Sequence, residues 1–139
     1  MNNIQLVVFD IAGTTVADNG QVAGAFMDAF RTAGVELPVE EVKKVMGFRK
    51  IDAVRLLLDK FSPGSPSGAE RESLITEIHD RFIRAMISFY RQDPDLKPLP
   101  YAEQLFSRLR EKGVKIALNT GFTRAITDAI LQRLHWDNG

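Results

Sequence analysis

Two short apolar runs, one near each end of the chain, differ from the amphipathic pattern of the rest. Residues 6–9 and 114–118 are rich in β-branched side chains, which favours buried strands of a parallel sheet. Elsewhere apolar residues recur at helical spacing, at about 22–33, 38–46, 50–58, 74–89, 102–109 and 123–134. Strands joined through helices are typical of α/β folds, and this is the fold class that the pattern predicts.

The helical segments are too many for one crossover between two strands. About eighty residues separate the first predicted strand from the helix that begins near Pro100. A loop rich in Ser, Pro and Gly at 62–68 and a proline-containing linker at 93–100 interrupt this stretch. We therefore expect a helical insertion above the sheet.

Composition narrows the classes of function. The 139 residues carry 18 basic and 18 acidic side chains and no cysteine. The balanced charge argues against a sequence-independent nucleic-acid binder, and no apolar run approaches the ~20 residues of a membrane helix. The lack of cysteine excludes disulfides and thiolate chemistry. We expect no nucleic-acid partner, no membrane partner and a cytoplasmic location.

Polar residues follow both predicted strands. Asp10 ends the first, and Thr120 with Gly121 follows the second. Ligands of open α/β sheets bind beyond the carboxyl ends of the strands, where an aspartate can attack phosphorus. The backbone N–H groups of the turn at 13–15 are expected to hold an anion. The alternative is that Asp10 merely caps this turn and that Thr120 is an ordinary turn hydroxyl.

These residues resemble the motifs of the haloacid dehalogenase superfamily. Residues 8–16, Val-Phe-Asp-Ile-Ala-Gly-Thr-Thr-Val, are similar to its first motif, and 114–120 to its second. The stretches 46–52 and 120–124, together with Ala12 in place of the usual second aspartate, resemble its phosphonatase-like branch. The resemblance extends over essentially the whole chain.

The resemblance implies roles for individual residues. Asp10 would be the nucleophile and a Mg²⁺ ligand, and the backbone carbonyl of Ala12 a second ligand. Lys50 matches the lysine that forms an imine with an aldehyde substrate. The residues implied in substrate binding are Gly13, Thr14, Thr120, Gly121, Arg49, Met46 and Gly47.

The resemblance also implies a division into domains. Residues 1–16 and 98–139 would form part of a Rossmann-like core, and 17–97 a helical cap. The superfamily needs a later basic residue and a later acidic pair, both downstream of the second motif after further strands, and the sequence offers no acidic pair or additional strand there. We therefore expect a core that is truncated after the second strand and its helix.

Several positions depart from the phosphonatase pattern. Ala12 cannot protonate an alkoxide leaving group, which fits cleavage of a carbon–phosphorus bond through an imine. Ala53 and Phe122 stand where the branch has a histidine and a tyrosine. An exposed cap lysine with no chemical role is the alternative for Lys50.

The sequence therefore predicts a Mg²⁺-dependent phosphonatase-like hydrolase that acts on a small phosphonate or phosphate through an aspartyl phosphate. A homodimer is the candidate assembly. The alternative is an inactive fragment, or an oligomeric fold remnant, that retains the phosphate loop.

Overall fold

The structure is a computed structural model that describes residues 3–138. The chain divides into two compact units. Residues 1–19 and 93–120 form a small sheet unit, and residues 20–92 and 121–139 form a helical unit. The boundary after β2 falls between Thr120 and Gly121, so the predicted second motif at 114–120 lies in the sheet unit and the stretch 120–124 contributes residues to both units.

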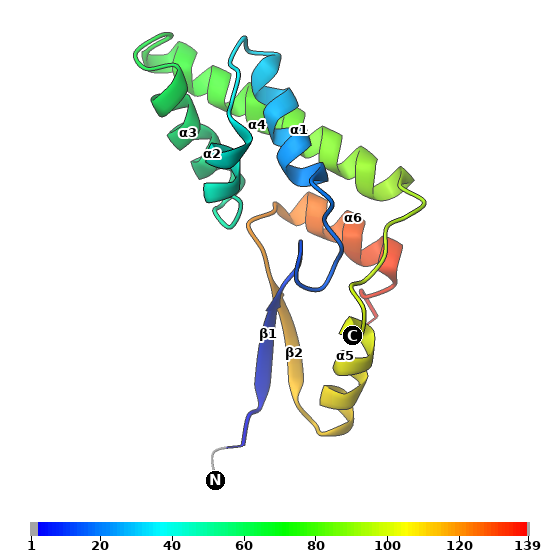
Figure 1. Cartoon of the computed structure of the whole chain (residues 1–139). Coiled ribbons are helices and arrows are strands. Elements are labelled where there is room, and N and C mark those ends of the chain that lie inside the picture. The colour runs from blue at the N-terminus through cyan, green and yellow to red at the C-terminus, as the bar shows by residue number, and fades with distance from the viewer. Residues whose placement is uncertain (1–2, 139) are drawn as a thin grey trace. The chain divides into compact units, whose positions relative to one another are not determined.

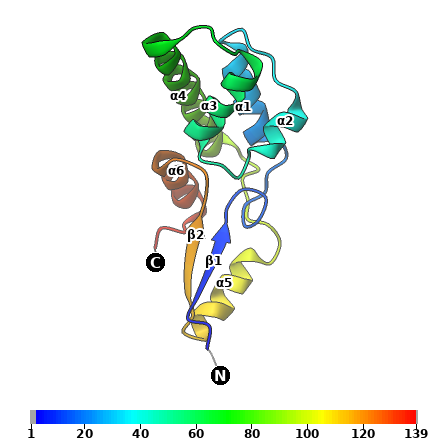
Figure 2. The same cartoon turned by 90° about the vertical axis from the view of Figure 1, so that its left-hand side faces the viewer.

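From residue 3 on, the sheet unit contains two parallel strands and one helix (Figures 1 and 2). Strand β1 spans Leu6–Asp10, α5 spans Ala102–Glu111 and β2 spans Lys115–Asn119. The register pairs Leu6 with Lys115 at one end and Asp10 with Asn119 at the other. This arrangement confirms the predicted strand–helix–strand crossover of an α/β fold.

The predicted burial of β1 is wrong for one of its faces. Val7 and Phe9 are half-buried, and the Phe9 ring packs edge-on against Phe106 of α5, with 5.4 Å between ring centroids. Leu6 and Val8 point to the opposite face and are 52% and 55% exposed. The cause is that, among the described residues of this unit, α5 is the one helix that covers the sheet, whereas a continuous apolar run is typical of strands covered on both faces.

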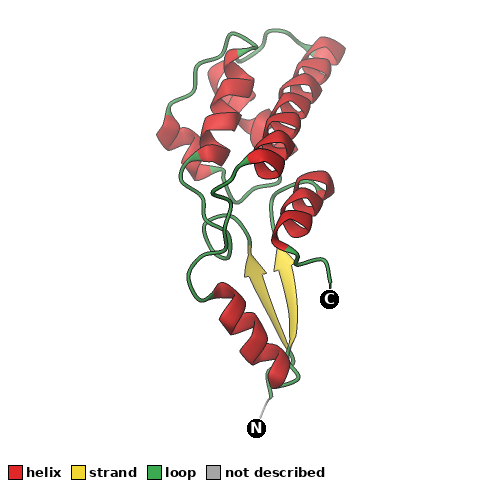
Figure 3. Cartoon of the chain, turned by 90° about the vertical axis from the view of Figure 1, so that its right-hand side faces the viewer, coloured by secondary structure: helices red, strands yellow, loops and turns green. Residues whose placement is uncertain are grey.

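In its described part, up to residue 138, the helical unit contains five helices, among which α4 is the longest (Figure 3). Their bounds are Gln21–Arg31 for α1, Val39–Lys44 for α2, Lys50–Phe61 for α3, Gly68–Gln92 for α4 and Arg124–Leu134 for α6. Helix α4 packs against α1, α3 and α6. All five were predicted from periodicity, with ends that shift by a few residues.

The core of the helical unit is aromatic where α1 meets α4. Phe26, Phe30 and Phe82 are fully buried. The ring of Phe26 lies 5.4 Å from that of Phe30 and 5.3 Å from that of Phe82, the latter edge-on. Such pairs stabilise a core beyond the burial of their area.

No helix in the described range 3–138 is both long enough and apolar enough to span a membrane. The predicted division into a core at 1–16 and 98–139 and a cap at 17–97 stays a prediction.

Candidate functional site

Asp10 and Thr120 lie at the same edge of the sheet. Asp10 is paired with Asn119 across the parallel strands, and Thr120 is the next residue after Asn119. Neighbouring strands are ~4.8 Å apart, and consecutive Cα atoms are about 3.8 Å apart. The register therefore brings the two residues of the predicted phosphoryl site close together. The Asp10 side chain is exposed, as a nucleophile at a sheet edge must be.

The turn after β1 is closed by its own backbone hydrogen bonds. The N–H groups of Thr14, Thr15 and Val16 all donate to the carbonyl of Ile11, at 3.1, 2.9 and 3.0 Å. The N–H of Gly13 donates to the carbonyl of Val16 at 2.8 Å. The expected cradle of anion-binding amides at 13–15 is therefore wrong, because these donors already have backbone acceptors. Substrate binding by Gly13 and Thr14 stays a prediction, and the exposed Thr14 hydroxyl is the group that could serve it.

Thr15 connects this turn to the candidate nucleophile. Its side chain is 2% exposed, and its Oγ1 donates to the backbone carbonyl of Asp10 at 2.9 Å. The N–H of Ile11 donates to Asp10 Oδ1 at 2.8 Å, which orients the carboxylate of the same residue. The role of the Thr15 hydroxyl was not predicted, since Thr15 was expected to contribute only its backbone N–H. The pair of threonines that follows the strand, Thr14 and Thr15, is the sequence feature that could have indicated it.

The residues proposed to hold Mg²⁺ have suitable donor atoms. Mg²⁺ is bound through one or two carboxylates together with waters and substrate phosphate oxygens, so few protein ligands suffice. Asp10 supplies a carboxylate. Ala12 pairs with Val16 in an isolated β-bridge. The two hydrogen bonds of this bridge join Gly13 to Val16 and Val16 to Ile11, so the Ala12 carbonyl takes part in neither of them. No group of three or more His, Asp or Glu residues suited to a metal occurs within residues 3–138.

Lys50 is buried at the first residue of α3. It is 3% exposed, so the alternative of an exposed cap lysine is wrong. Its Nζ donates to the backbone carbonyl of Met46 and, at 3.0 Å, to that of Phe48. The same Nζ lies 5.6 Å from the centroid of the Phe122 ring, within cation–π range. Sequence reasoning gave no signal for this burial.

The remaining predicted binding residues lie before α3, at Met46, Gly47 and Arg49, and after β2, at Gly121. Met46 is half-buried, Gly47 is exposed, and the Arg49 side chain is 78% exposed and lies 3.6 Å from Asp52. The Gly121 carbonyl accepts a hydrogen bond of 3.2 Å from the Lys50 N–H. Substrate binding by these four residues stays a prediction.

His79 of α4 lies partly within the packing of the helical unit. It is half-buried, and its Nε2 has no hydrogen-bond partner among the described residues. Burial lowers the pKa of His79, the Arg49 guanidinium lowers it further, and Asp80 opposes the change. The neutral imidazole is therefore favoured in the folded chain.

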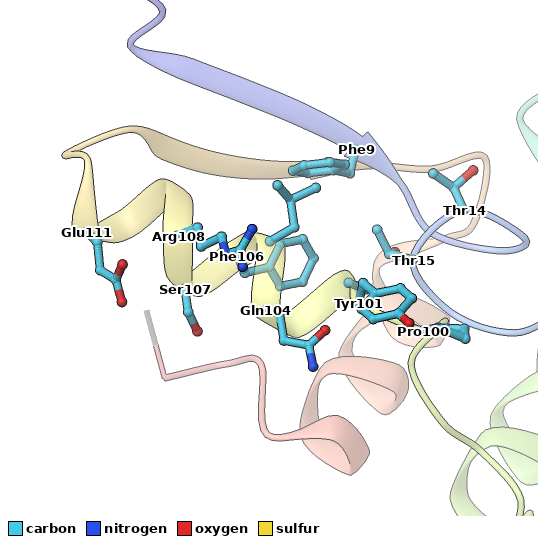
Figure 4. Close-up of a pocket in the computed structure, with 12 residues that line it drawn as sticks. Phe9, Thr14, Thr15, Pro100, Tyr101, Gln104, Phe106, Ser107, Arg108 and Glu111 are labelled. Atoms are coloured by element: carbon cyan, nitrogen blue, oxygen red, sulfur yellow. The ribbon is translucent and has the colours of Figure 1, made fainter.

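A groove runs along α5 in the sheet unit (Figure 4). Its volume is about 860 Å³, and its lining includes Phe9, Tyr101 and Phe106, with Thr14 and Thr15 near one end and Glu111 near the other. Neither Asp10 nor Thr120 is among the described residues that line it. The groove is mainly an apolar surface of the sheet unit and does not define the candidate chemistry.

Comparison with known proteins identifies the family of this chain. The family described as haloacid dehalogenase-like hydrolase matches residues 4–138. This chain belongs to the haloacid dehalogenase-like hydrolases. The match includes both motifs that carry Asp10 and Thr120, so the predicted superfamily is confirmed.

Curated relatives of this haloacid dehalogenase-like chain agree with the predicted branch. It is 35% identical over 137 residues to a phosphonoacetaldehyde hydrolase of Bacillus mycoides (strain KBAB4), covering 91% of this chain and 50% of the relative. It is 36% identical over 136 residues to a phosphonoacetaldehyde hydrolase of Bacillus cereus (strain G9842), with the same shares of the two chains. The chain thus spans about half the length of the curated relatives that it matches.

Solved structures support the fold. A phosphonoacetaldehyde hydrolase-like protein from Oleispira antarctica matches with a TM-score of 0.76 and 23% identity, over 98% of this chain and 50% of that one. A hydrolase from Pseudomonas syringae matches with a TM-score of 0.77 and 17% identity, over 94% and 56%. The predicted α/β fold of the superfamily is therefore confirmed for the part of it that this chain contains.

Proposed function

We propose that the protein containing this sequence is a Mg²⁺-dependent phosphonatase-type hydrolase that cleaves the carbon–phosphorus bond of a small phosphonate bearing an aldehyde, such as phosphonoacetaldehyde. The observation that carries the proposal is the register of the sheet, which brings Asp10 and Thr120 to one edge. A nucleophilic carboxylate beside a hydroxyl donor is the pair that phosphoryl transfer needs. The names of the curated relatives favour the aldehyde substrate.

Asp10 is the proposed nucleophile towards phosphorus. One carboxylate oxygen accepts the Ile11 N–H, which leaves the other oxygen to form the new bond to phosphorus. Thr120 would donate its hydroxyl hydrogen to a phosphoryl oxygen and hold the group in place. A bound Mg²⁺, held by Asp10 and the Ala12 carbonyl, would supply charge neutralisation at the phosphoryl oxygens.

Lys50 is the proposed electron acceptor for carbon–phosphorus cleavage. Its neutral amine would condense with the substrate aldehyde, release one water and form a protonated imine. As the Asp10 oxygen bonds to phosphorus, the electron pair of the breaking bond moves onto the adjacent carbon and neutralises the iminium as an enamine. Protonation of that carbon, hydrolysis of the imine and hydrolysis of the aspartyl phosphate consume two waters and regenerate both residues.

The surroundings of Lys50 are compatible with this chemistry. A neutral amine has two N–H bonds and a lone pair, so it could keep both carbonyl acceptors while the lone pair attacks the aldehyde. The methyl group of Ala12 provides no proton, and the imine route needs none for an alkoxide leaving group. The contacts of the Lys50 amine and the lack of an acid at Ala12 therefore support the same imine route.

The test is a phosphate-release assay on the full product of the reading frame that carries these 139 residues. The substrates are phosphonoacetaldehyde and a panel of small phosphate esters, each with and without Mg²⁺. We expect Asp10→Asn to abolish phosphate release from every substrate, because the amide cannot form the aspartyl phosphate. Turnover by this variant equal to that of the unsubstituted protein would exclude Asp10 as the nucleophile.

A second variant separates phosphonatase from phosphatase activity. Lys50→Arg keeps a cation but cannot form an imine, so it should lose cleavage of phosphonoacetaldehyde while any hydrolysis of phosphate esters persists. Borohydride reduction during turnover should add the two-carbon product unit to Lys50, measured by mass spectrometry. Turnover of phosphonoacetaldehyde with no adduct at Lys50 would remove the imine step, whereas turnover of phosphate esters alone would leave a phosphatase.

A further inference from the structure

The backbone approaches Gly121 more closely than any side chain there would allow. A Cβ atom built on Gly121 would lie 2.3 Å from the Phe48 carbonyl oxygen and 3.0 Å from its carbon. It would also lie 3.1 Å from Lys50 Nζ. Gly121 has no positive φ, so the backbone conformation does not require glycine, and the requirement is one of space alone.

The same contact satisfies a backbone donor of α3. Lys50 is the first residue of this helix, and the first N–H groups of a helix have no acceptor within it. Arg49 at the N-cap makes no side-chain capping bond. The Gly121 carbonyl accepts the Lys50 N–H at 3.2 Å and so substitutes for a cap from a distant part of the sequence.

Both contacts converge on one amine. The Phe48 carbonyl that lies against Gly121 is one of the two carbonyls that accept from Lys50 Nζ. Phe122, the residue after Gly121, places its ring 5.6 Å from the same Nζ. Tyr90 of α4 is 2% exposed, and its ring packs edge-on against Phe122 at 6.0 Å, which fixes the ring in turn.

We propose that Gly121 is a positioning residue for Lys50: its missing side chain lets the Phe48 carbonyl close against it, and this contact fixes the amine between two carbonyls and the Phe122 ring. The proposal rests on the proposed function for the catalytic importance of Lys50. The placement itself is measurable without turnover.

The first experiment measures the reactivity of Lys50 in Gly121→Ala. Each lysine is labelled with a limiting amount of acetic anhydride and quantified by mass spectrometry, with exposed Lys43 as the internal reference. In the unsubstituted protein the buried Lys50 should label far more slowly than Lys43. In Gly121→Ala the Lys50 rate should rise about tenfold while the Lys43 rate is unchanged, because only the local contact opens.

Gly24→Ala is the matched control. Gly24 lies within α1, has no positive φ, and has no atom within 4 Å of a built Cβ. This variant should leave the ratio of Lys50 to Lys43 labelling unchanged. A Lys50 rate in Gly121→Ala that stays within about twofold of the unsubstituted value, with far-UV circular dichroism preserved, overturns the proposal.

A second measurement needs no variant and keeps the proposal testable if Gly121→Ala does not fold. Amide hydrogen exchange by NMR should show the Lys50 N–H protected relative to the N–H of Ile51, the next residue of the same first helical turn. Equal exchange of the two amides would mean that the Gly121 carbonyl does not hold α3, and the proposal fails.

Turnover separates this proposal from the proposed function. In the full-length enzyme, Gly121→Ala should lower kcat for phosphonoacetaldehyde more than it changes KM, because the amine is misplaced rather than removed. If the unsubstituted enzyme turns over no substrate while labelling and exchange behave as expected, the proposed function fails and the positioning of Lys50 stands.

Discussion

The hydroxyl of Thr15 offers a direct test of how the candidate nucleophile is held. Thr15→Val keeps the shape of the side chain and removes the donor to the Asp10 carbonyl, a bond of 2.9 Å at a residue that is 2% exposed. A buried hydrogen bond contributes about 0.5–1.5 kcal/mol net, so the free energy of unfolding should fall by about 1 kcal/mol. Urea titration followed by far-UV circular dichroism measures the loss as a lower midpoint at unchanged slope.

Thr15→Ser is the matched control for that variant. It keeps the hydroxyl and loses one buried methyl group, which costs about 0.8 kcal/mol, so the two variants should have similar stability. They should differ in turnover by the full-length enzyme. Thr15→Val should lower kcat about 10- to 100-fold by misplacing Asp10, and Thr15→Ser should retain most of it. Equal kcat values in the two variants would refute the idea that this hydroxyl orients the nucleophile.

Two further predictions concern the helical unit. Because burial and the Arg49 guanidinium lower the pKa of His79 from its ordinary value of 6.5, the unfolded chain binds this proton more readily than the folded one. The contribution of His79 to the free energy of unfolding is therefore fully present above pH 6.5 and is lost as the pH drops below this value, by at most about 1.4 kcal/mol per pH unit. His79→Gln should remove this part of the pH dependence, measured by urea unfolding at several pH values. An identical pH dependence in the variant would contradict the prediction. Phe82→Ala leaves a cavity beside Phe26 and should lower the free energy of unfolding in urea by about 3–5 kcal/mol. The control Phe48→Ala changes a side chain that is 47% exposed and should lower it by less than about 0.5 kcal/mol. Similar losses in the two variants would show that the aromatic core is misassigned.

Element types were predictable because they depend on local periodicity. Apolar residues at helical spacing identified α1 and α4, and the run that ends at Asp10 identified β1. Burial of the strand was not predictable in the same way. It depends on what covers each face of the sheet, and in the sheet unit α5 covers the face of Phe9 and leaves Val8 exposed.

The sheet edge of the candidate site was predictable for a topological reason. Parallel strands end at the same edge, so residues that follow two such strands must come close, and the pairing of Asp10 with Asn119 confirms this for Thr120. The state of the turn after β1 was not predictable. Whether its N–H groups face a ligand or the Ile11 carbonyl depends on backbone angles, including the positive φ of Gly13, that residue types alone do not determine.

The burial of Lys50 at the start of α3 is the feature furthest from what the sequence indicates. A helix N-terminus carries partial positive charge, which disfavours a cation at its first residue. The carbonyls of Met46 and Phe48, which precede the helix, oppose this effect by accepting from Nζ. The amine is therefore held by backbone atoms of the preceding turn, whose conformation in turn depends on the space left at Gly121. The imine-forming role of Lys50 stays a prediction, and the packing of the backbone around Gly121 is what would keep this flexible side chain in a reactive position.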